Sequence, residues 1–321
     1  MRGSLVRRAA YEVFDRAHKV LQRQRALKDL AASRQVDYLR DEVANRTIER
    51  LAFVTKKFDK VVDLGSGAGS LEKAICSGTE DGNIVKSRLG EITMVDSCKE
   101  LLYRDADLPF NREMNIKRLV ADEETFWPGE SQVDAVISSM SLHWINDLPG
   151  VLKRVENMLK PDGMFMANMV GGDSLYELRT SLQLAEQERY GRISPRLSPL
   201  ADVKDMGGLM QQAKYKLLTI DVDDIIVNYP DMFALMDDLK AMGENNAIKV
   251  RPWTIPRDLL QAANSIYTHM HGDEDGSVPA TFRVIYMIGW KYSEDQPKPL
   301  ERGTADVSFK DILPQMGEDG K

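Results

Sequence analysis

Three aspartates stand where carboxylates could bind a ligand. Asp63, Asp96 and Asp122 each lie at or near the end of a short apolar run that predicts a β-strand, in residues 61–64, 91–97 and 118–122. Ligands of open α/β folds sit at the carboxyl ends of parallel strands. The three acids therefore predict one ligand-binding edge of a sheet.

A glycine-rich turn follows the first of these aspartates. Gly65, Gly67 and Gly69 precede a helical pattern over residues 70–75, and glycines allow the backbone to turn tightly and approach a ligand closely. The spacing G-x-G-x-G differs from the dinucleotide fingerprint, and Asp63 would repel a pyrophosphate. An anion there suits a cationic ligand with an amino group, so S-adenosylmethionine fits better than NAD.

Further strand ends complete the predicted cofactor site. A carboxylate at the position of Asp96 accepts hydrogen bonds from ribose hydroxyls in nucleoside-binding folds, and Asp122 is placed to face an adenine amino group. Residues 132–139 predict a fourth strand, and its Ser138 joins the set. The predicted cofactor-binding residues are Asp63, Gly65, Gly67, Gly69, Asp96, Asp122 and Ser138.

Candidates for a substrate pocket follow the fourth and fifth predicted strands. His143, in the segment Ser139–Trp144, is interpreted either as a general base or as a ring packed over a nucleoside. Asp173 and Glu177 lie four residues apart and share a face if their helix begins at Ser174, so they could hold a guanidinium in bidentate geometry. The alternative is a helix cap and a surface charge. His269 and His271 do not share a helix face, and no metal site is predicted.

Composition limits the class of protein. The chain has 321 residues and a net charge of −7, which suits one large α/β domain with an insertion and argues against nonspecific nucleic-acid binding. Its two cysteines are too few for a disulfide framework or a thiolate zinc site. No apolar run approaches the roughly 20 residues that a membrane helix needs.

The N-terminal segment has the opposite charge. Residues 1–28 hold eight basic residues against two acids, and Met1–Tyr11 contains no acid. This composition is compatible with a short mitochondrial presequence, and the alternative is a solvated basic helix.

The predicted organisation has five parts: a basic segment at 1–30, a cofactor-binding domain at 31–228, a helical insertion at 229–271, the last strand of the same domain at 272–292 and a tail at 293–321.

Local patterns predict the following elements. Helices are expected at 36–53, 148–159 and 202–214 and after 174, and a loop is expected at 77–91. A turn at 160–163 precedes a strand at 164–169, and separate strands are expected at 217–222 and 224–228. Asp147 is the predicted cap of the second of these helices.

Several longer blocks carry a family resemblance: Ser138–Pro149, Gly171–Arg179, Val227–Pro230, Asp275–Thr281 and Tyr286–Tyr292. With the strand-end acids, they make the chain resemble the class I S-adenosylmethionine-dependent methyltransferase superfamily, and within it the protein-arginine hydroxylases that assist assembly of mitochondrial complex I. The resemblance implies a seven-stranded, mostly parallel sheet whose last strand, at 282–292, is antiparallel.

The resemblance also implies a function. It implies a mitochondrial matrix protein, peripheral to the inner membrane, that hydroxylates an arginine of an iron–sulfur subunit of complex I and works with a small partner assembly factor. Residues alone favour methyl transfer to a protein or a small carboxylic acid, because proximity supplies most of that rate and no two-histidine, one-carboxylate iron set is present. The neighbourhood of Leu142–Trp144 is shared in outline with acyl-carrier-protein O-methyltransferases. A non-catalytic assembly chaperone that holds S-adenosylmethionine is the third alternative.

Overall fold

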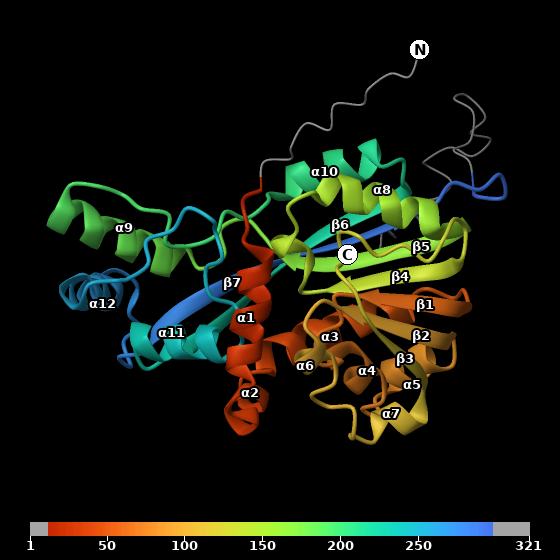
Figure 1. Cartoon of the computed structure of the whole chain (residues 1–321), viewed down its shortest axis with the longest axis horizontal. Coiled ribbons are helices and arrows are strands. Elements are labelled where there is room, and N and C mark those ends of the chain that lie inside the picture. Colours follow the sequence, from red (N-terminus) through yellow and green to blue (C-terminus); the bar gives the residue numbers. More distant parts are fainter. Residues whose placement is uncertain (1–11, 298–321) are drawn as a thin grey trace, which may run out of the picture.

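A seven-stranded sheet forms the centre of the molecule (Figure 1). The computed structural model describes residues 12–297. The strand order is β3-β2-β1-β4-β5-β7-β6, and β7 is antiparallel to both of its neighbours. The predicted fold class is therefore confirmed. The strands are β1 (Phe58–Leu64), β2 (Leu89–Asp96), β3 (Asn115–Val120), β4 (Val133–Ser139), β5 (Leu159–Val170), β6 (Lys216–Tyr229) and β7 (Val278–Trp290).

Helices connect and cover these strands. They are α1 (Arg16–Ala26), α2 (Leu30–Gln35), α3 (Tyr38–Ala52), α4 (Ser70–Ile75), α5 (Glu80–Lys86), α6 (Lys99–Leu102), α7 (Phe110–Glu113), α8 (Leu148–Met158), α9 (Tyr176–Tyr190), α10 (Val203–Gln212), α11 (Met232–Ala241) and α12 (Arg257–His271), with a 3₁₀ turn η1 at Leu142–Trp144. Asp147 accepts a hydrogen bond from the Gly150 amide, so the predicted cap of α8 is confirmed.

The two faces of the sheet bury separate apolar cores. Val61 packs with α3, α4 and α5 on one face, whereas Val62 packs with α8 and α10 on the other, because successive strand side chains point to opposite faces. This double cover, visible in Figure 1, fixes the carboxyl ends of β1, β2 and β4 at one edge of the domain.

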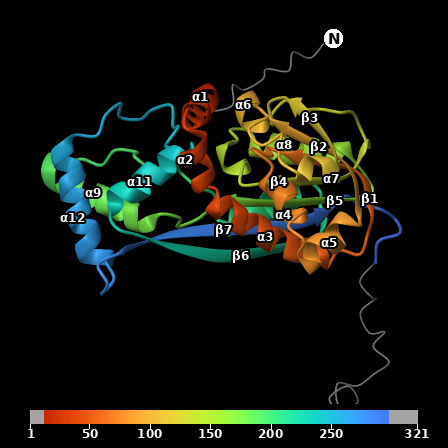
Figure 2. The same cartoon turned by 90° about the horizontal axis from the view of Figure 1, so that it is seen from below.

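The long strands β6 and β7 extend beyond the other strands of the sheet, and their extended part supports a third core. Buried residues of α9, α11 and α12 pack on these strands and on the first turns of α3, and Figure 2 shows the three helices together at one end of the molecule. The predicted helical insertion thus contains α11 and α12, joined by an irregular connection at residues 242–256.

Three local predictions are wrong. The predicted loop at 77–91 contains α5, which Thr79 caps by accepting from the Gly82 amide. The two predicted strands at 217–228 are one strand, β6, because its pairing with β7 continues through Asp223 and Asp224 at the expected break. The predicted turn at 160–163 lies inside β5, where the register against β4 shifts.

Two of the predicted segments lie partly outside the described residues. The acid-free stretch Met1–Tyr11 and residues 298–321 of the predicted tail are not part of the structure described here.

Candidate functional site

The glycine turn between β1 and α4 has the backbone that the sequence predicts. Gly65, Gly67 and Gly69 have φ angles of +78°, +58° and +94°, a region that favours glycine. A Cβ on Gly65 would also lie 2.1 Å from the Ser141 hydroxyl oxygen. The turn therefore brings the main chain of β1 directly against the segment that follows β4.

Asp96 lies beside this turn at the end of β2. Its carboxylate is fully buried, with Oδ2 accepting from the Gly67 amide at 3.0 Å and Oδ1 accepting from the Cys98 amide at 2.7 Å. The structure thus brings Asp96 and the glycine turn together, with the carboxylate held by two main-chain amides.

Two other predicted strand-end residues, Asp122 and Ser138, form hydrogen bonds within the protein. Asp122 follows β3 and accepts from the Glu124 amide at 2.8 Å and from Arg16. The buried Ser138 hydroxyl donates to the Leu64 carbonyl at 2.7 Å, which ties β4 to β1. Both lie at the predicted edge, and their contact with a cofactor stays a prediction.

Asp63 lies beneath the turn, beside Glu72 of α4. Both carboxyls are buried, and neither accepts a hydrogen bond within the described part of the chain. Burial, then the charge of Glu72, raises the pKa of Asp63 well above its usual range, and burial raises the pKa of Glu72 to about 7. A proton held between them would let one carboxyl donate to the other.

Helix α1 covers this edge, and the sequence analysis, which offered a solvated basic helix as the alternative for residues 1–28, did not predict that contact. Arg16, Lys19 and Arg23 lie on one face of α1, and all three point at acids or at the ring of Trp144. Their spacing of three and four residues behind the N-cap Asp15 was the available signal. As a consequence, the solvated reading of the basic segment is wrong for this face of α1, since Lys19 and Arg23 are buried.

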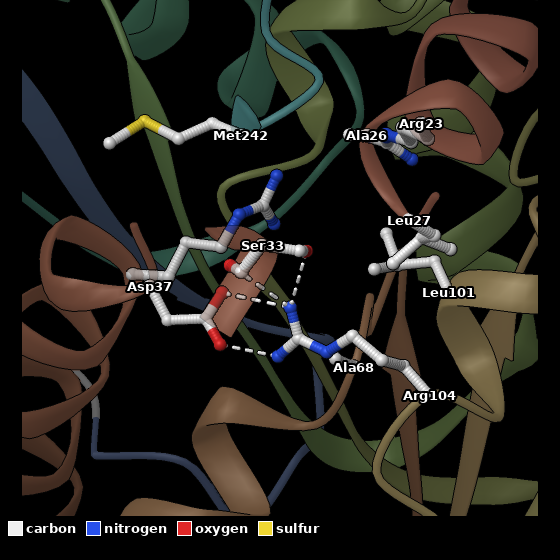
Figure 3. Close-up of a pocket in the computed structure, with 10 residues that line it drawn as sticks. Arg23, Ala26, Leu27, Ser33, Asp37, Ala68, Leu101, Arg104 and Met242 are labelled. Atoms are coloured by element: carbon white, nitrogen blue, oxygen red, sulfur yellow. Dashed lines mark hydrogen bonds and ion pairs between the residues drawn. The ribbon is translucent and has the colours of Figure 1, made fainter. Parts of the chain in front are cut away.

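Two small cavities lie beside this cover. Arg23 and Ala26 of α1 and its C-cap Leu27 face Ala68 and Leu101 across about 10 Å³ (Figure 3), and a second cavity of about 10 Å³ separates Arg23 from Ser97 and Ser141. Each holds about one water molecule. Arg23 therefore divides the cleft above Asp96.

Glu244, in the connection after α11, is also absent from the predicted site residues. Its carboxylate accepts from Trp144 Nε1 and from Arg40 Nη2, each at 2.5 Å, and lies 3.7 Å from His143 Nε2. Burial alone would raise the pKa of Glu244, but Lys19, His143 and two arginines hold it well below its usual range. Burial lowers the pKa of Lys19 to about 7.

A larger cavity lies beside Glu244 and His143. It has a volume of about 400 Å³ and an apolar wall from α9, α11 and the connection before α12, including Leu178, Leu239 and Ile255. His143 and Glu244 also line it, as do Arg179, Arg196 and Arg251, and burial lowers the pKa of His143. Within residues 12–297, Glu244 is the single carboxylate on the cavity wall.

The predicted pair of substrate carboxylates does not form. The helix begins at Tyr176 rather than Ser174, with Leu175 in the left-handed region at its N-cap, because Ser174 Oγ instead bonds the Gly171 carbonyl and the Arg283 amide. Asp173 is exposed and pairs with Arg283 at 3.0 Å, whereas Glu177 is buried against Thr281. Neither residue lines the 400 Å³ cavity.

Residues 12–297 show neither a metal-ion cluster nor a membrane-spanning helix. No group of three or more histidine, cysteine or acidic side chains is arranged there to hold a metal ion. No helix in the same residues has the length and apolar character needed to span a bilayer.

Comparisons with known proteins agree with this geometry. Residues 35–220 match a family model described as a methyltransferase domain. The YcgJ protein of Bacillus subtilis has a similar fold, with a TM-score of 0.52 and 13% identity over 77% of this chain and 99% of that one.

Sequence relatives are more specific. Arginine-hydroxylase NDUFAF5, mitochondrial, of Danio rerio is 43% identical over 305 residues, or 95% of this chain and 91% of the relative. The human protein of that name is 42% identical over 94% of this chain and 83% of its own length. A malonyl-[acyl-carrier protein] O-methyltransferase of Methylovorus is 28% identical over 85% and 88% of the two chains. The chain belongs to the methyltransferase-domain family, in the group that contains the NDUFAF5 arginine hydroxylases.

Proposed function

We propose that the protein binds S-adenosylmethionine at the carboxyl ends of β1 and β2. The donor set fits: the Asp96 carboxylate is held by the Gly67 amide, and the three glycines of the turn carry no side chain that would keep a ligand from the main chain. Asp96 would hold the ribose hydroxyls, and the turn would face the amino-acid end of the cofactor. When bound, this cofactor supplies an electrophilic methyl group next to a sulfonium.

The protein further acts as a protein-arginine hydroxylase. The observation that carries this assignment is the 43% identity to an arginine hydroxylase over 95% of the chain. The 400 Å³ cavity supports it, because the apolar part of its wall can enclose the stem of an arginine while Glu244, the carboxylate on that wall, accepts from the guanidinium. His143, neutral through burial, would orient that carboxylate.

The target is an arginine of an iron–sulfur subunit of mitochondrial complex I, and the modification promotes assembly of the complex together with a small partner assembly factor. The word "mitochondrial" in the relatives' names supports this location. We place the protein in the matrix, peripheral to the inner membrane. Replacing Arg2, Arg7 and Arg8 with glutamine should reduce protease-protected import into mitochondria, and unchanged import would mean that these arginines carry no targeting information.

Methyl transfer to a protein or a small carboxylic acid is the second candidate. It is favoured by the methyltransferase domain and by the 28% identity to malonyl-[acyl-carrier protein] O-methyltransferase. The reaction needs mainly a positioned nucleophile. A non-catalytic chaperone that holds S-adenosylmethionine is the third.

The mass of the modified substrate separates these candidates. Cells that lack the protein would be complemented with wild type or with Glu244→Gln, and the arginine peptides of the iron–sulfur subunit would be measured at high resolution. We expect one added oxygen with wild type and none with the variant. An added methylene instead would establish methyl transfer, and normal assembly with unmodified arginine would establish the chaperone.

A further inference from the structure

Arg23 is a buried cation without a close acceptor. Its side chain is 5% exposed, and the nearest carboxylate oxygens, of Asp96 and Glu244, lie 3.6 Å and 3.9 Å from its terminal nitrogens. Both distances exceed that of a hydrogen bond. Its Nε has no partner among residues 12–297. Buried donors are nearly always satisfied, so this guanidinium points to an acceptor that binds beside it.

The neighbouring arginines differ at their terminal nitrogens, although Arg16 Nε also has no partner among residues 12–297. Arg40 donates to Glu244 at 2.5 Å, and Arg16 donates to Asp122 at 2.8 Å. Arg23 alone among these three lies between the two cavities of about 10 Å³ that flank the cleft above Asp96. In Figure 3 its helix faces the glycine-turn residue Ala68 from across the cavity. An acceptor for Arg23 would therefore lie over the glycine turn.

The chemistry of the guanidinium selects the acceptor. Its planar fork matches a carboxylate in bidentate geometry. Ribose hydroxyls are donors to Asp96 and do not require this cation. The proposed cofactor carries one carboxylate, at its amino-acid end, and that end would face the turn.

We propose that Arg23 changes partner when the cofactor binds: it leaves Asp96 to the ribose hydroxyls and binds the carboxylate of the cofactor's amino-acid end. The inference rests on the proposed function for the identity of the cofactor. It also explains why the cleft is narrow here, since Arg23 occupies the space above Asp96 until the exchange occurs.

Two ligands test the exchange in the full-length chain by titration calorimetry. S-adenosylmethionine has the carboxylate, whereas 5′-methylthioadenosine keeps the nucleoside and lacks the amino-acid end. We expect Arg23→Gln to weaken S-adenosylmethionine binding at least about tenfold, as for loss of a hydrogen bond between charged groups. Binding of 5′-methylthioadenosine should stay the same or tighten, because Asp96 is released.

Two further variants complete the design. Arg25→Gln removes an exposed arginine of the same helix and should change neither affinity. Arg23→Lys keeps the charge without the fork and should give an intermediate loss for S-adenosylmethionine alone. If a thermal unfolding measurement shows that Arg23→Gln is not folded, the same ligand comparison is made with Arg23→Lys.

The outcomes are distinct. An equal loss of both ligands would make Arg23 a structural residue, and tighter S-adenosylmethionine binding in Arg23→Gln would make it only an obstacle; either result overturns the exchange and leaves the proposed cofactor in place. Failure of the wild-type protein to bind S-adenosylmethionine would overturn the proposed function as well.

Discussion

The Arg16 guanidinium lies 2.8 Å from the Asp122 carboxylate, across 106 residues of sequence. Arg16 also bonds Glu123, so it joins the first turn of α1 to the segment after β3. Since the Arg16 side chain is only 17% exposed, these contacts are partly shielded from water. They fix the N-terminal end of α1 over the proposed cofactor edge.

Replacing Arg16 with glutamine should therefore destabilise the protein. A hydrogen bond to a charged group contributes roughly 1.5–3 kcal/mol, and we expect a loss of about that size in the free energy of unfolding, measured by denaturant titration. Arg25→Gln, on the exposed side of α1, should change the free energy by less than about 0.5 kcal/mol. Equal effects of the two variants would show that α1 does not depend on the Arg16 contacts.

Asp96 tests the cofactor assignment directly. Asp96→Ala removes the carboxylate predicted to hold the ribose and should weaken S-adenosylmethionine binding roughly 10- to 100-fold, equivalent to about 1.5–3 kcal/mol. The matched control is Asp134→Ala at the opposite end of the sheet, where Asp134 pairs with Lys160. Unchanged affinity by calorimetry would remove Asp96 from the ribose site, and equally tight NAD binding would replace the cofactor.

Replacing Glu177 should destabilise the protein, whereas replacing Asp173 should have little effect on its stability. Glu177→Ala leaves the Thr281 hydroxyl and amide without their acceptor, which should cost about 1–3 kcal/mol of unfolding free energy. Asp173→Ala removes an exposed partner of Arg283, which keeps Asp224 at 2.8 Å; surface pairs contribute less than about 1 kcal/mol. Arginine modification should persist in Asp173→Ala, and its loss there would restore the sequence prediction.

Much of the sheet edge that we propose to bind the cofactor could be predicted, because it depends on local sequence patterns. The apolar runs before Asp96 and the positive-φ glycines after β1 are visible within a few residues of sequence, and strand ends of a parallel sheet meet at one edge. The fold class followed from the same patterns together with the resemblance of the longer blocks.

The rest of the site depends on distant contacts. Glu244 meets Arg40 across 204 residues and Trp144 across 100, and no local pattern marks that position. The start of α9 was misplaced because Ser174 resembles an N-cap in sequence, whereas its hydroxyl bonds the Arg283 amide 109 residues away. Tertiary contacts outweighed local preference at both places.

The carboxyl pair beneath the glycine turn predicts an unusual dependence of stability on pH. Burial raises the pKa of Glu72 from 4.5 to about 7 in the folded protein, so the folded state keeps a proton that the unfolded chain releases. The free energy of unfolding should then fall as the pH rises from about 4.5 towards 7, by roughly 1–3 kcal/mol. Lys19, whose pKa burial lowers to about 7, and His143, whose pKa burial also lowers, change the free energy of unfolding in the opposite direction, so the Glu72 contribution is measured as the difference between the wild type and a Glu72 variant.

Glu72→Gln tests this origin. The amide does not titrate and can donate to Asp63, so the decline over the same pH range should become smaller than in the wild type. Glu80→Gln, on the exposed first turn of α5, should retain the full decline. An equal change with pH in the wild type and in Glu72→Gln would show that Glu72 does not hold this proton in the folded state.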